Sequence, residues 1–141
     1  MSQLDMLLAG ERTPGVYQWL SAPIAGKVKA VVEDASWRFV AMDTTTVVDK
    51  AGLLDAVAKT FGFPAYYGRN FDVFADSLSD VHDDDGVLVW WEGWAGLAAL
   101  NPQATAMALE AFAARAADVE ASTFVVILAG TGPELDVPTF D

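Results

Sequence analysis

Residues 87–91 read VLVWW, and residues 123–129 read TFVVILA. Nearly every position in these two runs is apolar, whereas a strand with one wet face alternates apolar and polar residues. Short apolar runs of this kind predict β-strands that are buried on both faces. Because such strands need cover on each side, they favour a parallel sheet packed between helices, and therefore an α/β fold.

Helical and strand patterns alternate around these two runs. We expect further strands at 15–20 and 38–43, where the sequence reads GVYQWL and RFVAMD. The spacing of apolar residues predicts helices over 22–36, 49–60, 71 to about 81, and 102–117. The predicted fold class is therefore α/β, with a small, mainly parallel sheet of three strands plus an extra N-terminal strand, flanked by helices.

Two of these helices have apolar stripes that identify their buried faces. The residues expected to be buried from the helix at 22–36 are Val28, Val31, Val32 and Ala35. The residues expected to be buried from the helix at 49–60 are Leu53, Leu54, Val57 and Phe61. The turn at Thr44–Thr46 supplies a candidate N-terminal cap region for the second helix.

The length and composition of the chain exclude several classes of protein. A chain of 141 residues fits a single domain, 1–141. It contains no cysteine, which excludes a disulfide scaffold, a thiolate zinc site and a cysteine nucleophile, and suits a reducing cytoplasm. Residues 1–10 contain no basic segment and no long apolar run. We therefore expect neither a signal peptide nor a membrane span, and we expect a cytoplasmic protein.

The charge balance restricts the possible partners. Twenty acidic residues against eight basic ones give a formal net charge of -12. Such a surface repels nucleic acids and anionic membranes and attracts basic proteins. We therefore expect no nucleic-acid partner and no membrane partner. The total charge alone is equally consistent with a role in solubility. The positions of the acidic residues must therefore decide between solubility and binding to a basic partner.

Three sequence patterns that suggest a cofactor or catalysis are incomplete. Residues 130–132, GTG, follow a strand, but Leu135 stands where a dinucleotide loop has its third glycine. Val81 stands where a calcium loop around residues 82–86 needs its first oxygen ligand. His82 is the only histidine, which is too few for the usual zinc ligand set. We expect no catalytic residue, no metal and no cofactor, and hence no enzyme.

The helix that begins after Asn70 carries the most informative charge pattern. At 100° per residue, its apolar face is made by Phe71, Phe74, Leu78 and Val81. Its opposite face is made by Asp72, Asp76 and Asp80. Like charges four residues apart destabilise a helix by about 0.2–0.5 kcal/mol per pair, and no lysine or arginine lies between residues 72 and 85 to offset this. We interpret the acidic face as a surface that binds positive charge, with an ordinary solvated face as the alternative.

The loop before this helix supports that interpretation. Residues 62–70 read GFPAYYGRN, so two glycines and a proline end the preceding helix. Asn70 is a favourable N-cap for the next helix. Tyrosine provides a large rigid contact area with a polar tip and is common in binding hot spots. We expect Tyr66 to be exposed beside Gly68, and Tyr67 to pack on the core.

Residues 63–78, which read FPAYYGRNFDVFADSL, resemble the signature of the barstar family. The shared features are a proline, a Tyr-Tyr-Gly turn, an asparagine cap, and a helix with two aspartates four residues apart. A weaker similarity extends over 38–129, which leaves 1–37 as an N-terminal extension of a strand plus a helix, and 130–141 as an irregular tail. Barstar-family proteins are intracellular inhibitors of the ribonuclease barnase, and the resemblance implies their fold, a three-stranded parallel sheet surrounded by helices.

The resemblance also implies where a ribonuclease would bind. Asp76 would be the central anchor, at the position that the phosphate of the substrate would occupy, and Ser79 and Asp80 would flank it. The partner-binding residues implied in this way are Tyr66, Gly68, Asn70, Asp72, Ala75, Asp76, Ser79 and Asp80. Together they would plug the basic RNA-binding cleft of the enzyme in a 1:1 complex.

Several positions differ from the family pattern. Arg69 stands where an acid is usual, Ala75 replaces a tryptophan, and Ser77 stands where a cysteine can occur. A later acid that contacts the enzyme is missing near residues 113–115. These differences concern the identity of the partner more than the mode of binding. The implied partner is a small basic ribonuclease, barnase-like or a toxin domain of that type, with this chain as the immunity protein.

Two other functions are compatible with the sequence. One is an acidic binding module of the same fold with a basic partner that is not a ribonuclease. The other is a hydrolase that uses Asp72 and Asp76 as acid and base. Side chains four residues apart on one helix point in the same direction, and no substrate pocket is implied, so the pattern favours binding over catalysis.

Overall fold

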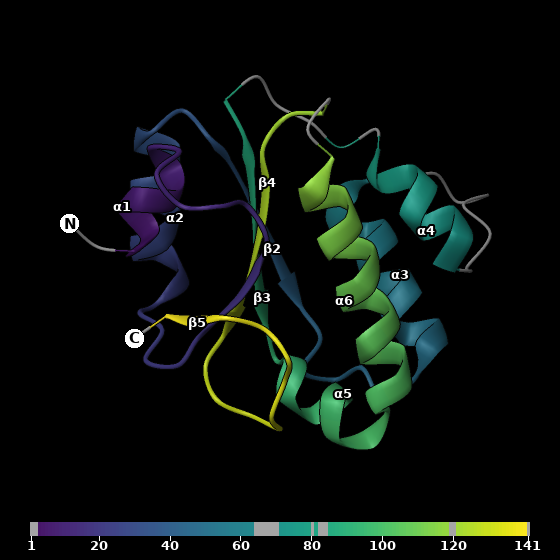
Figure 1. The fold of residues 1–141 in the computed structure, drawn as a ribbon. Coiled ribbons are helices and arrows are strands. Elements are labelled where there is room, and N and C mark those ends of the chain that lie inside the picture. The colour runs from purple at the N-terminus through teal and green to yellow at the C-terminus, as the bar shows by residue number, and fades with distance from the viewer. Residues whose placement is uncertain (1–2, 64–70, 80, 82–84, 119–120, 141) are drawn as a thin grey trace.

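The computed structural model describes residues 3–63, 71–79, 81, 85–118 and 121–140, and for residues 71, 72 and 140 it describes the backbone alone. The elements of the N-terminal half are α1 (Gln3–Leu8), β1 (Val16–Trp19), α2 (Ala25–Asp34), β2 (Arg38–Asp43), α3 (Lys50–Phe61) and α4 (Phe71–Leu78). The elements of the C-terminal half are β3 (Val87–Glu92), α5 (Trp94–Leu100), α6 (Pro102–Ala117), β4 (Phe124–Ala129) and β5 (Thr139–Phe140). Strands and helices therefore alternate along most of the chain (Figure 1).

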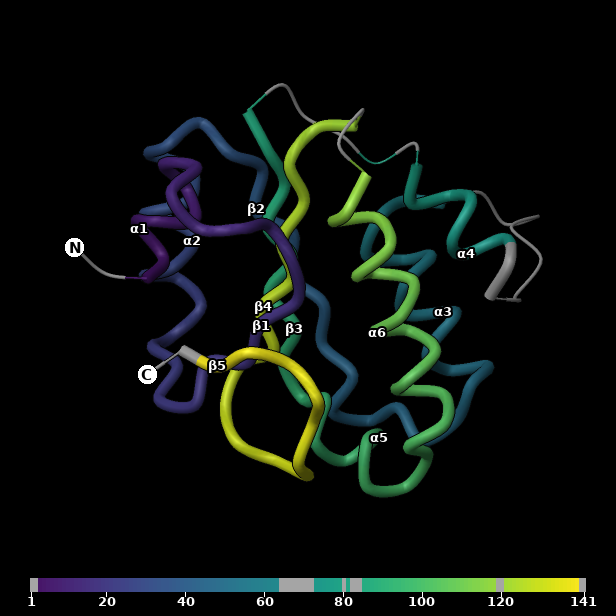
Figure 2. The backbone as a smooth tube through the Cα atoms, viewed as in Figure 1, coloured from purple at the N-terminus to yellow at the C-terminus, as the bar shows by residue number. Residues whose placement is uncertain are grey.

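All the strands form one parallel sheet with the order β2-β3-β4-β1-β5. The two apolar runs of the sequence, β3 and β4, are neighbours, with Val87 opposite Phe124. The extra N-terminal strand, β1, lies between β4 and the short β5 (Figure 2). The predicted fold class, a small parallel α/β sheet of three strands plus an N-terminal one, is confirmed.

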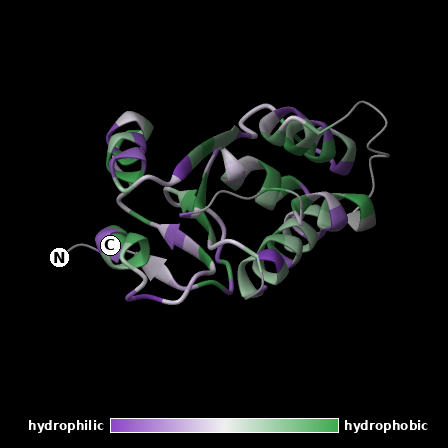
Figure 3. Cartoon of the chain, turned by 90° about the horizontal axis from the view of Figure 1, so that it is seen from above, coloured by the Kyte–Doolittle hydropathy of each residue, from purple (hydrophilic) through white to green (hydrophobic). Residues whose placement is uncertain are grey.

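Helices cover both faces of the sheet. Helices α1 and α2 lie on one face, and α3, α4, α5 and α6 lie on the other (Figures 1 and 3). Within β3, Val87, Val89 and Trp91 belong to the core under α3–α6, whereas Leu88 and Trp90 belong to the core under α1 and α2. All five side chains are 0% exposed. This two-sided burial explains why the strand has no polar alternation.

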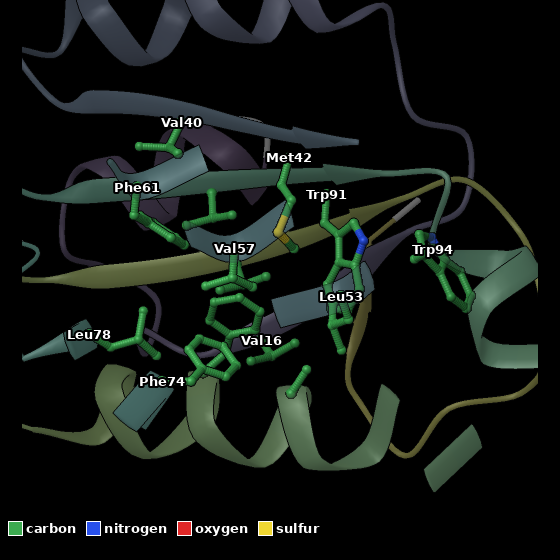
Figure 4. Packing of buried hydrophobic residues seen from close by; sticks show 14 of the residues in the cluster. Val16, Val40, Met42, Leu53, Val57, Phe61, Phe74, Leu78, Trp91 and Trp94 are labelled. Carbon is green, nitrogen blue, oxygen red and sulfur yellow. The ribbon is translucent and has the colours of Figure 1, made fainter. Parts of the chain in front are cut away.

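The larger core is organised around Phe112 of α6. Its ring centroid lies 5.3 Å from that of Phe74 on α4, 5.9 Å from that of Trp91 on β3, and 6.2 Å from that of Phe124 on β4. The predicted stripe of α3, made by Leu53, Leu54, Val57 and Phe61, is buried in the same core (Figure 4). Offset and edge-on aromatic pairs of this kind contribute about 0.5–1.5 kcal/mol each beyond the area they bury. One aromatic cluster therefore joins α4 to the sheet.

Some local predictions differ from the structure. Helix α2 buries Val28 and Val32 as expected, but Val31 is 40% exposed and Ala35 is also exposed, because α2 contacts the sheet through a narrower stripe than predicted. The N-cap of α3 is Asp49, whose carboxylate accepts a hydrogen bond from the Gly52 amide at 2.8 Å. Residues Thr44–Thr46 therefore do not cap that helix.

Three elements were not predicted: α1, α5 and β5. Helix α1 packs Leu4 and Leu7 into the smaller core. Helix α5 begins immediately after β3, and its N-cap is Gly93, whose backbone has φ +68°. A side chain at that position would meet the Thr45 backbone at 2.5 Å, so this tight turn requires glycine. Strand β5 occupies two residues of the predicted irregular tail.

Thr44 joins the carboxyl ends of β2 and β3. Its side chain is 0% exposed. Its hydroxyl donates to the Gly93 carbonyl at 3.1 Å and accepts a hydrogen bond from the indole nitrogen of Trp91 at 2.8 Å. Thr44 is therefore the hydrogen-bond partner of a tryptophan that is wholly buried in the larger core.

We predict that Thr44→Val lowers the free energy of unfolding by about 1–3 kcal/mol, because the indole N–H of Trp91 then loses its buried partner. Thr46→Val is the matched control, since Thr46 is exposed in the same turn. Urea denaturation followed by tryptophan fluorescence measures both variants. Equal midpoints for the two variants would contradict the role assigned to Thr44.

Candidate functional site

The candidate site is the outer face of α4. The inner face of this helix packs against α6 and α3, with Phe74 and Leu78 both 0% exposed. Val81, just beyond the helix, is also buried. The predicted amphipathic arrangement is therefore present at the positions that the structure describes, and the helix presents its other face to solvent.

Asp76 lies in the middle of that outer face. Its side chain is exposed, as are those of Ala75 and Ser79. Within the described part of the chain, the Asp76 carboxylate forms no hydrogen bond and no ion pair. No residue that the structure describes therefore competes for its two oxygens, and charge-assisted hydrogen bonds to a carboxylate are about twice as strong as neutral ones.

The remaining predicted site residues are not all described. Tyr66, Gly68, Asn70 and Asp80 lie outside the described residues. Tyr67, expected to pack on the core, lies outside them as well. Asp72 is in the first turn of α4, but the structure describes only its backbone. Three of the predicted positions, Ala75, Asp76 and Ser79, are thus brought together on one exposed surface.

A buried arginine fixes the C-terminal end of α4. Arg115 of α6 is only 5% exposed. Its Nε donates to the Leu78 carbonyl at 3.0 Å, and its Nη2 donates to the Val81 carbonyl at 2.7 Å. Its Nη1 donates to the Ser122 carbonyl at 3.0 Å. The last carbonyls of a helix have no partner within the helix. Arg115 donates to the Val81 carbonyl and adds a second hydrogen bond to the Leu78 carbonyl, which also accepts from the Val81 amide at 3.0 Å.

The environment of Arg115 is apolar on one side and acidic on the other. Its guanidinium lies over the Phe124 ring, 4.8 Å from the ring centroid. Burial lowers the pKa of Arg115 from its ordinary value, and the carboxylate of Asp118 raises it. An arginine keeps its proton at neutral pH, so a positive charge stands at the negative end of the α4 dipole. This charge stabilises the helix that carries Asp76.

Sequence reasoning did not assign this role to Arg115. The signal was nevertheless present, because the buried positions of α6 repeat with helical spacing. These positions are Ala104, Thr105, Ala108, Phe112 and Arg115. An arginine on the core-facing stripe of a helix requires buried hydrogen-bond acceptors. The carbonyls at the C-terminal end of a neighbouring helix, which have no partner within that helix, are one source of such acceptors.

A small notch separates α4 from α6 beside Asp76. It has a volume of about 130 Å³. Its walls include Ala75 and Ser79 from α4, and Ala111 and Ala114 from α6. Asp118 lies at the same notch. The small side chains leave room for one side chain of a partner between α4 and α6.

Other kinds of site receive no support from the described residues. Among them, no group of three or more histidine, aspartate or glutamate side chains could hold a metal ion. None of the helices in the described ranges is long and apolar enough to cross a bilayer.

We predict that Arg115→Met lowers the free energy of unfolding by about 2–4 kcal/mol, because buried carbonyls at the end of α4 lose a charged donor. Amide hydrogen exchange at residues 75–78 should accelerate together with this loss. Arg38→Met is the matched control, because Arg38 is exposed on β2. Unchanged exchange at residues 75–78 in Arg115→Met would contradict the role of Arg115 in holding α4.

Comparisons with known proteins agree with this architecture. The family model described as barstar (barnase inhibitor) matches residues 37–129. Among solved structures, the chain is similar to the Aeropyrum pernix ORC2 protein in its ADPNP–ADP complexes, with a TM-score of 0.59 and 11% sequence identity. That match covers 92% of this chain and 38% of the other, so this chain spans less than half of the ORC2 chain, and the likeness concerns the fold alone. A comparison with curated proteins finds no match.

Proposed function

Because this chain belongs to the barstar family, we propose that it inhibits a small basic ribonuclease by placing the outer face of α4 in the RNA-binding cleft of that enzyme. The family model covers β2, α3, α4, β3, α5, α6 and β4. The proposed activity is binding and not catalysis, and its setting is the cytoplasm. The observation that carries the proposal is the exposed carboxylate of Asp76, which has no partner among the residues that the structure describes, on a helix that the core and Arg115 hold in place.

The proposed mechanism is occlusion by charge mimicry. A ribonuclease cleft binds the phosphates of RNA through lysine, arginine and histidine side chains, and carboxylates can take the place of those phosphates. Asp76 would occupy the centre of the contact. The other proposed partner-binding residues are Tyr66, Gly68, Asn70, Asp72, Ala75, Ser79 and Asp80. One copy of the chain would block one enzyme molecule.

The position of Asp76 on a rigid helix favours tight binding. A side chain that is already held in its bound geometry loses less conformational freedom on association than a side chain on a mobile loop. The acids of this chain, which give a net charge of -12, would attract a basic enzyme from a distance and accelerate association at low ionic strength. Screening by salt should slow association, because charges in solution interact over only about 10 Å at 0.1 M salt.

The likeness to the ORC2 protein does not extend to a nucleotide site here. The segment after β1 has Gly26 and Lys27, in the first turn of α2, at two positions of the phosphate-binding pattern G-x-x-x-x-G-K-[ST]. Ser21 stands at the first glycine, and Val28 stands at the residue whose hydroxyl binds magnesium. Val28 is 1% exposed and belongs to the smaller core. The residues of this segment therefore favour a packing role over phosphate binding.

We predict that Asp76→Asn weakens inhibition of a small basic ribonuclease that co-purifies with this chain by at least about tenfold. The enzyme keeps its positive charges but loses the carboxylate that pairs with them. Asp34→Asn is the matched control, because Asp34 is exposed on α2, on the other face of the sheet. Inhibition constants at 50 and 200 mM salt provide the measurement.

Two results would count against the proposal in different ways. Equal inhibition by Asp76→Asn and by the parent chain would remove Asp76 from the contact. Capture of basic proteins that have no ribonuclease activity would favour the alternative function, an acidic binding module of the same fold.

We predict that Ala75→Trp weakens the same complex by at least about tenfold, because the indole fills the notch beside Asp76 that would receive a partner side chain. Ala30→Trp is the control, since Ala30 is exposed on α2. Isothermal titration calorimetry compares the two variants. Retention of the parental affinity by Ala75→Trp would show that the notch is not used.

A further inference from the structure

A second concave surface lies on the opposite side of α6. It is a cavity of about 470 Å³ between α6 and the tail segment 133–137. Val16 of β1 and Ala98 of α5 contribute to its wall. Ligand-binding cavities commonly measure about 300–1,000 Å³, so its size suits a small organic molecule.

The walls of this cavity are largely apolar. Val16 and Ala98 are buried, at 7% and 5% exposure, and belong to the larger core. Leu109, Leu135 and Val137 are half-buried side chains that pack against the same core. A ligand with an apolar body would remove these surfaces from water, which favours binding.

The cavity is also acidic, and none of the described residues that line it is basic. Glu110 on α6, and Glu134 and Asp136 on the tail, contribute to its lining and are exposed. None of these three carboxylates forms a hydrogen bond or an ion pair with another residue that the structure describes. No lysine, arginine or histidine is among the residues that line the cavity.

The other polar group in the wall, Thr105, is already engaged. Its hydroxyl donates to the Asn101 carbonyl at 3.2 Å, within the first turn of α6. Thr105 is 1% exposed, so it adds little polar surface. The available recognition chemistry is therefore an apolar interior combined with three carboxylates.

We propose that this cavity binds an organic cation with an apolar body, such as an aryl-alkyl or alkyl ammonium or guanidinium compound. The apolar part would contact Leu109, Leu135 and Val137, and the cation would pair with the three carboxylates. Charge-assisted hydrogen bonds from a cation to a carboxylate are stronger than neutral ones. An anion of the same shape would be repelled, and a neutral isostere would bind without the charge pairing.

This site is separate from the surface proposed for the ribonuclease. Successive residues of a helix are about 100° apart, so the cavity-lining residues Thr105 and Leu109 project from α6 about 140–180° away from Ala114, which lines the notch beside α4. The tail segment 133–137 lies beyond the residues that the family model matches, 37–129. The cavity is thus partly built by a segment that is additional to the family region.

The test uses the full chain, ¹⁵N-labelled, in low salt, and 4-phenylbutylammonium as the probe. Two isosteres, 4-phenylbutanol and 4-phenylbutyrate, are titrated in parallel. We expect the cation to shift amide signals of residues 105–113 and 134–137, and to bind at least about tenfold more tightly than the alcohol, with the carboxylate weakest. Absence of shifts in these two segments, or equal affinity for all three compounds, would overturn the proposal.

Two pairs of variants separate the cavity from general electrostatics. Ala106→Trp should fill the cavity and lower affinity for the cation at least about tenfold, whereas Ala117→Trp, exposed elsewhere on α6, should not. The triple variant E110Q/E134Q/D136N should reduce binding of the cation to the level of the alcohol. The triple variant E11Q/E33Q/D34N makes the same change in net charge at exposed positions outside the cavity and should leave binding unchanged. Equal loss in both triple variants would assign the effect to net charge and overturn the site.

Discussion

The stability of the acidic helix α4 depends on the buried guanidinium of Arg115. Helix α4 has eight residues, a length at which an isolated helix is not stable in water. Its aspartates also make it a poor helix by intrinsic propensity. Burial of Phe74 and Leu78 supplies part of the compensation, and the hydrogen bonds from Arg115 to the carbonyls of Leu78 and Val81 supply a second part at the end of the helix. The outer face of α4 can therefore carry aspartates that repel one another, because the contacts that stabilise the helix are made by its inner face and its C-terminal end.

Two-sided burial of the sheet explains why the chain extends beyond its family region. The matched residues 37–129 contain β2, β3 and β4 and the helices of one layer. Leu88, Trp90, Val125 and Ile127 point to the other face of that sheet. Helices α1 and α2 cover this face, with Leu4, Leu7, Val28 and Val32 packed against it, while β1 widens the sheet beside β4. The two N-terminal helices thus complete a second core and lie on the side of the sheet away from α4 (Figure 1).

The sequence predicted those features that depend on short-range patterns. The apolar runs located β3 and β4, and helical spacing located α3, α4 and α6, with the bounds of α6 matching the structure. Features that depend on tertiary contacts were missed. Helix α5 follows β3 at a glycine with positive φ and has seven residues, too few for a clear period. Arg115 acts through carbonyl groups of other elements, which the sequence pattern alone does not bring together.

Helix α6 connects the two surfaces and keeps them apart. One side of it, with Ala111, Ala114 and Arg115, faces α4 and the notch. The other side, with Ala106, Leu109 and Glu110, faces the tail. The many alanines of this helix permit close approach on both sides, while Phe112 and Ala108, each 0% exposed, anchor it to the sheet. The two surfaces thus share one supporting helix, and the hydrogen bonds from Arg115 to the carbonyls of Leu78 and Val81 tie that helix to the end of α4.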